Sequence, residues 1–173
     1  IHEQGAGVPA DEAEARRWWT RAAEAGSANA EYVLASSLGA AGNEPGAAEA
    51  GMSWLRRAAE SGHLEAQLEL AARYEDGDGV EADRAEAIRW YLQAADGGSA
   101  KGRALYGRNL MLGIGVDPDV EGGLSYILEA AAEGDPRGLT LAGYCYQVGR
   151  GVEQNSARAA EFYREAAEEG DAE

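Results

Sequence analysis

The segment 74–83, "YEDGDGVEAD", places carboxylates and glycines at short spacing, and this combination could serve three kinds of chemistry. It could hold calcium, because alternating carboxylate oxygens are calcium ligands. It could cradle a phosphate, because a glycine-rich loop exposes backbone N–H groups. It could also be a turn whose acidity has no function.

The calcium and phosphate interpretations both fail on the residues present. An EF-hand loop needs another oxygen ligand two residues after Asp78, where Val80 stands. A phosphate-binding G-x-G-x-x-G loop follows a strand and has a third glycine, whereas this segment follows a helical pattern and lacks that glycine. We therefore expect a structural turn.

Nucleophiles and metal ligands are scarce elsewhere. The chain has two histidines, His2 and His63, and one cysteine, Cys145. These residues form no Cys–His pair, no Ser–His–Asp set and no metal cluster with recognisable spacing. Carboxylates number 31, too many for any one pair to stand out. No catalytic residue, metal ligand or cofactor is predicted, and the protein is not expected to be an enzyme. His63 is expected in a turn, and Cys145 as a partly exposed thiol.

Charge and hydrophobicity argue against two classes of partner, nucleic acid and the membrane interior. A formal net charge of -16 argues against nucleic acid, because phosphates would be repelled. No apolar run approaches the roughly 18 residues that a membrane-spanning helix needs. The first residues lack the features of a secretory signal, but the sequence also lacks an initial Met, so the compartment stays open.

The motif G-x-G-V recurs at a fixed step, which identifies the elements around the opening segment. "GAGV", "GDGV", "GIGV" and "GRGV" end at Val8, Val80, Val116 and Val152, and a degenerate "AGNE" ends at Glu44. The step is 36 residues or its double, which is typical of a solenoid. Because the single acid of "GDGV", Asp78, is replaced in the other copies, the copies share only the glycines and the valine.

Other columns keep the same step and predict one helix in each copy, helix B. An aromatic column contains Trp18, Trp54, Trp90, Tyr126 and Phe162, and the next column contains Trp19, Leu55, Tyr91, Ile127 and Tyr163. Side chains at this spacing share one helical face with a pair of alanines further on. The predicted N-caps are Asp11, Asp83, Asp119 and Asn155, with capping boxes through Glu14 and Glu86. The predicted left-handed C-caps are Gly26, Gly62, Gly98, Gly134 and Gly170.

A second helix, helix A, is predicted in each copy at about 29–40, 65–76, 101–112 and 137–148. Its predicted N-caps are Ser27, Ser99 and Asp135, and Pro136 suits the first helical position. Each copy is therefore predicted to be a helical hairpin.

The full pattern, A-x3-L-[AG]-x2-Y-x2-G-x-G-V-x2-D-x3-A-x2-W-Y-x2-A-A-x2-G, is clearest in residues 66–98. It resembles the Sel-one-like repeat (SLR) family, which is related to the tetratricopeptide repeats. The resemblance covers a half-repeat at 1–28 and repeats at 29–64, 65–100, 101–136 and 137–172. The repeat at 29–64 departs most, with Asn43 and Pro45 at the turn and Ala47 in place of the cap.

The resemblance implies an all-α, right-handed α-solenoid in which helices A line a concave groove and helices B form the convex side. It also implies a non-catalytic scaffold or adaptor for protein partners. The chain is predicted to be one repeat domain, 1–173, and a segment of a longer array, because each end lacks a neighbouring helix A. Trp18 and Trp19 are expected to be partly exposed at one end, and Phe162 and Tyr163 at the other.

The helical wheel points one stripe of each helix A away from the core, where a partner peptide or helix could bind. The predicted groove residues are Lys101, Leu105, Arg108, Arg137, Leu141 and Tyr144. Their basic and apolar character favours an acidic, apolar partner. Two alternatives stay open. The leucines could pack between neighbouring helices A, with the arginines as ordinary solvated surface. The protein could instead be a structural element that self-assembles by stacking its ends.

Overall fold

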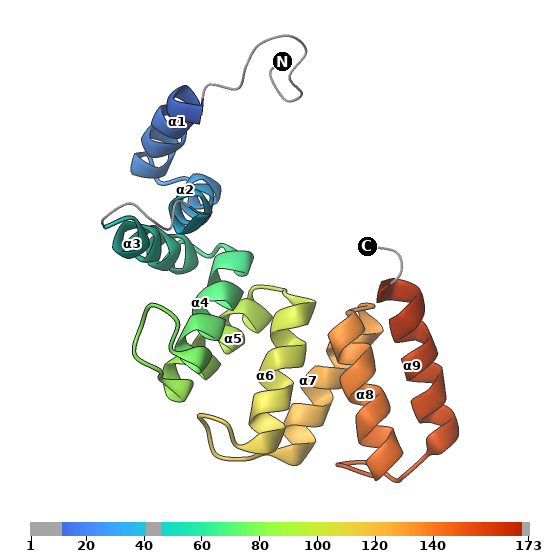
Figure 1. Cartoon of the computed structure of the whole chain (residues 1–173). Coiled ribbons are helices and arrows are strands. Elements are labelled where there is room, and N and C mark those ends of the chain that lie inside the picture. The colour runs from blue at the N-terminus through green and yellow to red at the C-terminus, as the bar shows by residue number, and fades with distance from the viewer. Residues whose placement is uncertain (1–11, 41–45, 171–173) are drawn as a thin grey trace. The chain divides into compact units, whose positions relative to one another are not determined.

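The structure is a computed structural model that describes residues 12–40 and 46–170. These residues form nine α-helices and no strand (Figure 1). The helices are α1 (Glu12–Glu24), α2 (Ala28–Ala40), α3 (Ala47–Glu60), α4 (Leu64–Asp76), α5 (Arg84–Asp96), α6 (Ala100–Leu112), α7 (Val120–Ala132), α8 (Pro136–Val148) and α9 (Ser156–Gly170). The all-α prediction is confirmed. The expected "GAGV" turn, the cap at Asp11, and Asn43 and Pro45 lie outside the described residues.

Helices A and B alternate along the chain as the two sets of columns predict. Helices A are α2, α4, α6 and α8, and each starts one residue before its predicted range and ends where predicted. The chain divides into two compact units, 1–66 and 67–173, and the division falls within α4. In the first unit α2 packs on α1 and α3, and in the second α6 packs on α7 and α8 on α9.

Side-chain caps start the helices B where the oxygen-bearing column predicts them. Asp83 accepts hydrogen bonds from the Ala85 and Glu86 backbone N–H groups at 2.9 and 3.0 Å. Asp119 and Asn155 cap α7 and α9 in the same way. The capping box predicted at Glu86 is wrong, because its carboxylate accepts from Arg89 while the Asp83 N–H donates to the Tyr74 carbonyl.

The opening "GDGV" segment is a turn, as predicted. Gly77 and Gly79 have φ of 76° and 71°, a left-handed conformation that glycine adopts without a steric cost. Left-handed glycines also follow four helices B, at Gly26, Gly62, Gly98 and Gly134. The same prediction is wrong for Gly170, which is the last residue of α9 and has no positive φ.

One hydrophobic cluster of the second unit lies between α6, α7, α8 and α9. Its buried residues include Met111, Leu124, Ile127, Leu139, Cys145 and Phe162. Cys145 is 1% exposed, so the prediction of a partly exposed thiol is wrong. Phe162 is also buried, against expectation, because its ring stacks on Tyr146 of α8 at 5.6 Å. Tyr163 is half-buried, and its hydroxyl donates to Gln147.

The first unit has a smaller core of Ala23, Ala30 and Leu34, against which Trp54 packs. Glu31 is buried beside it, where its carboxylate pairs with Arg57 at 2.9 Å and accepts a hydrogen bond from Ser61. A buried carboxylate is tolerated when it is paired in this way.

Candidate functional site

The described residues contain no cluster of three or more potential metal-ligating side chains. Nor does any described helix combine the length and apolarity that crossing a membrane requires. Burial raises the pKa of the Cys145 thiol, an effect that Arg150 partly opposes. Because the thiolate is the reactive form, this cysteine is poorly suited to nucleophilic chemistry. His63 caps α4 through Nδ1, which accepts from the Ala66 N–H, and its ring stacks on Tyr32.

The predicted groove residues all lie on α6 and α8, two helices A that contact each other in the second unit (Figure 1). They occupy one stripe on each helix, at positions that match after a shift of 36 residues. On α6 the stripe consists of Lys101, Leu105, Arg108 and Leu112, and on α8 it consists of Arg137, Leu141, Tyr144 and Val148. We call these eight positions the α6/α8 face.

The predicted groove residues differ in how much of their surface is exposed. Lys101 and Arg137 are exposed, and Tyr144 keeps 46% of its surface exposed. Leu141 is half-buried against the core. Leu105 is only 7% exposed, so although it lies on the face it offers a partner little surface.

Arg108 is already engaged within the unit. Its Nη2 lies 3.0 and 3.3 Å from the two carboxylate oxygens of Glu75 on α4. Its Nε donates to the side-chain oxygen of Asn109 at 3.0 Å. Glu75 also accepts a hydrogen bond from the Tyr91 hydroxyl of α5 at 2.9 Å. One carboxylate therefore links three helices.

Two exposed apolar residues of the face lie outside the six predicted site residues: Leu112, which the helical wheel also points toward the groove, and Val148, which the sequence reasoning missed. They are 46% and 49% exposed at the last positions of α6 and α8. The 36-residue step could have identified both residues from the sequence, because it places them on the same stripe, one turn beyond Arg108 and Tyr144. Large apolar side chains exposed in phase on adjacent helices are typical of an interaction surface.

The charge of the two helices contrasts with that of the whole chain. α6 and α8 contain four basic residues, Lys101, Arg103, Arg108 and Arg137, and no acidic residue. The chain as a whole has a net charge of -16. Arg103 pairs with Glu129 and Glu133, and Arg108 pairs with Glu75. Within the described residues, Lys101 and Arg137 form no ion pair.

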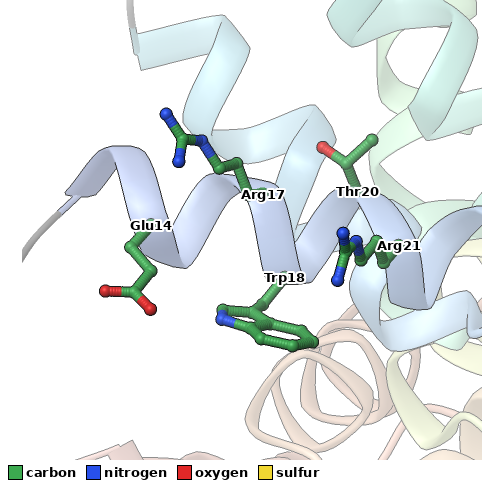
Figure 2. Close-up of a pocket in the computed structure, with 5 residues that line it drawn as sticks. All are labelled: Glu14, Arg17, Trp18, Thr20 and Arg21. Carbon is green, nitrogen blue, oxygen red and sulfur yellow. The ribbon is translucent and has the colours of Figure 1, made fainter.

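The first unit has a different exposed surface, on α1. Trp18 and Trp19 are 58% and 42% exposed, which confirms the expectation for this end. Figure 2 shows Trp18 with Glu14, Arg17, Thr20 and Arg21, the five residues of α1 that line a pocket. The Arg21 guanidinium lies 5.1 Å from the Trp18 ring centroid. Among the residues that the structure describes, one helix supplies this lining, so polar groups from different elements do not converge on it.

Comparisons with known proteins agree on the family. The model of the Sel1 repeat matches residues 1–27, 28–63, 64–99, 100–135 and 136–171. The structure resembles that of a Sel1 repeat protein from Oxalobacter formigenes, with a TM-score of 0.86 and 29% identity over 95% of this chain and 68% of that chain. It also resembles c5321, a protective antigen present in uropathogenic Escherichia coli strains that displays an SLR fold, with a TM-score of 0.81 and 34% identity.

The match to the E. coli antigen covers 90% of this chain but only 33% of that chain, so this chain spans about a third of its length. Helicobacter pylori cysteine rich protein B shares the fold at 20% identity, with a TM-score of 0.55 over 70% of this chain and 87% of that chain. No curated protein matched. The predicted resemblance to the Sel-one-like repeat family and the predicted all-α repeat-solenoid fold are confirmed.

Proposed function

Because this chain belongs to the Sel1 repeat family, we propose that it is a non-catalytic scaffold that binds a segment of another protein on the α6/α8 face. Sel1 repeats are protein-interaction repeats, and their fold is generally a non-catalytic scaffold. The assignment of the binding surface to α6 and α8 goes beyond that family property.

One observation carries the proposal: Leu112, Tyr144 and Val148 are exposed in phase on two helices that contact each other. Apolar and aromatic anchors of this kind contribute most of the binding free energy in protein interfaces. Lys101 and Arg137, which form no ion pair with any residue that the structure describes, lie on the same stripes, in the first turns of α6 and α8. Cations beside apolar anchors favour an acidic partner, because complementary charge increases the association rate and discriminates against basic competitors.

Selection of displayed peptides on the intact protein tests this proposal. Peptides that bind the wild type should lose about tenfold or more in affinity against the double variant Tyr144→Ala/Val148→Ser, because two apolar anchors are removed. The matched control is Trp18→Ala, which removes an exposed aromatic side chain from the first unit and should leave binding unchanged. Selected peptides that bind the double variant as tightly as the wild type would contradict the proposal.

Self-assembly is the second candidate function, and the exposed Trp18 and Trp19 favour it. Light scattering over a range of protein concentrations separates the two candidates. A constant monomer mass supports the binding scaffold. A mass that rises with concentration, and falls back in Trp18→Ala, supports self-assembly through α1.

A further inference from the structure

The α6/α8 face has a basic end and an apolar end. On α6 the stripe runs from Lys101 to Leu112, and on α8 it runs from Arg137 to Val148. Each pair is 11 residues apart, which corresponds to about 16 Å along a helix axis. Because the two helices contact each other with their stripes in the same phase, the two cations form one band and the two apolar residues form another.

The middle of the face would also be basic if Arg108 were free, but Glu75 compensates its charge. Both carboxylate oxygens of Glu75 lie within 3.3 Å of the same guanidinium nitrogen. The side chains are 32% and 24% exposed, so water screens this pair less than it screens a fully exposed one. Charge-assisted hydrogen bonds of this kind are roughly twice as strong as neutral ones.

The Glu75 carboxylate has a second partner, Tyr91 of α5. The Tyr91 hydroxyl donates to its Oε2 at 2.9 Å, and Tyr91 is 2% exposed. If Glu75 swung away from Arg108, the buried hydroxyl would lose its acceptor, which is costly inside a protein. The carboxylate is therefore fixed beside Arg108 by a residue of a third helix.

We propose that Glu75 sets the charge selectivity of the α6/α8 face, so that the face binds an amphipathic helix of another protein whose carboxylates lie at one end only. This inference rests on the proposed function. The carboxylates pair with Lys101 and Arg137, and apolar side chains about 11 residues away along the bound helix pack on Leu112, Tyr144 and Val148. A carboxylate at the middle of the bound helix would meet Arg108 with its charge already neutralised by Glu75.

A helix fits this surface better than an extended strand does. The backbone groups of α6 and α8 are bonded within their own helices, so they offer no edge for strand addition. Side chains on two neighbouring helices form ridges that a third helix can pack between, at an axis separation of about 8–10 Å. A helix of about three turns reaches from the basic band to the apolar band.

Three synthetic peptides of equal length, stapled so that they are helical, test the proposal by fluorescence anisotropy on the intact protein. All carry two leucines at one end. The end-acid peptide has two glutamates at the other end, the middle-acid peptide has them at its centre, and the end-base peptide has lysines in place of the terminal glutamates. The wild type should bind the end-acid peptide about tenfold more tightly than either other peptide. This preference should disappear in Lys101→Glu/Arg137→Glu.

The variant Glu75→Gln keeps an acceptor for Tyr91 and Arg108 but removes the charge that compensates Arg108. It should raise the affinity for the middle-acid peptide about fivefold and leave the end-acid affinity within about twofold of wild type. Adding Arg108→Met to Glu75→Gln should abolish that gain. Glu86→Gln is the matched control, because it removes the charge of an α5 carboxylate that accepts a hydrogen bond from Arg89 and not from Arg108, and it should change neither affinity.

Arg108→Met alone should lower the affinity for the middle-acid peptide about fivefold, because it leaves the Glu75 carboxylate uncompensated at the middle of the face, and it should leave the end-acid affinity within about twofold of wild type. This test does not depend on the Glu75 variant. A middle-acid affinity that does not fall in Arg108→Met, or no gain in Glu75→Gln, overturns the inference. Equal binding of all three peptides that is lost in Tyr144→Ala keeps the proposed function and overturns the charge selectivity. Binding that is unchanged in Tyr144→Ala overturns both.

Discussion

Two glycines face each other where α6 and α7 cross, and the close approach of these helices can be tested by adding one methyl group. A Cβ built on Gly107 would lie 2.6 Å from the Gly123 carbonyl oxygen and 3.0 Å from Ile127 Cγ1. A Cβ on Gly123 would lie 2.5 Å from the Gly107 carbonyl oxygen. Comfortable contacts between non-bonded carbon atoms are about 3.5–4.0 Å. Because the nearest atom is backbone, relief requires α7 to move.

The change Gly107→Ala therefore has two opposing effects on the free energy of unfolding. Alanine is about 1 kcal/mol better than glycine inside a helix. Overpacking costs about 1–3 kcal/mol, and the upper part of that range applies where backbone must shift. We expect a net loss of about 1–2 kcal/mol, measured by urea unfolding followed by circular dichroism, with faster hydrogen exchange in α6 and α7.

The matched control is Gly39→Ala, which makes the same chemical change in α2 at a position where no described residue comes within 4 Å of the new Cβ. It should stabilise its unit by up to about 1 kcal/mol, because only the helix-propensity effect operates. Opposite signs for the two variants would support the close approach of α6 and α7. If Gly107→Ala stabilises the protein as Gly39→Ala does, the reasoning is refuted.

Three further predictions concern buried side chains. Trp90→Ala should cost about 3–5 kcal/mol in a urea titration, because Trp90 is 8% exposed, whereas Trp18→Ala should cost less than about 1 kcal/mol, because Trp18 is 58% exposed. Burial, followed by the hydrogen bond to Glu75, raises the pKa of the Tyr91 hydroxyl above its ordinary value of 10.0. Above that pH the unfolded state loses this proton before the folded state does, so the free energy of unfolding falls. Tyr91→Phe should therefore make the pH profile of the urea midpoint flatter above pH 10. Cys145 should react with a thiol reagent slowly in the native protein and rapidly in urea, and a rate unaffected by urea would contradict its burial.

The sequence alone was enough to predict the helices and turns, because these depend on local chemistry that recurs every 36 residues. The apolar columns identified the buried faces, and short polar side chains such as Asp83 marked the helix starts. The paired glycines of "GDGV" predicted a left-handed turn, since few other residues adopt that conformation. The capping box at Glu86 failed because Tyr74, on the preceding helix, supplies the acceptor that the local pattern assigned to Glu86.

The candidate site depended more on packing between helices. Cys145 shares its column with polar residues, which suggested exposure, yet its sulfur lies 3.9 Å from that of Met111 in the core between α6 and α8. Leu105 points outward on a helical wheel, but it is buried in the folded chain. A wheel describes one helix, whereas burial depends on every helix packed around it.

The sequence by itself determined that this protein is a stack of helical hairpins with basic and apolar stripes on its last two helices A, because period, capping and charge are local properties. Only the tertiary structure decided which stripe residues are available to a partner. The contact between Arg108 and Glu75 joins residues 33 positions apart, and it forms because α4 and α6 bring the two side chains together. The folded chain neutralises Arg108 and leaves the charges of Lys101 and Arg137 unpaired among the residues that the structure describes.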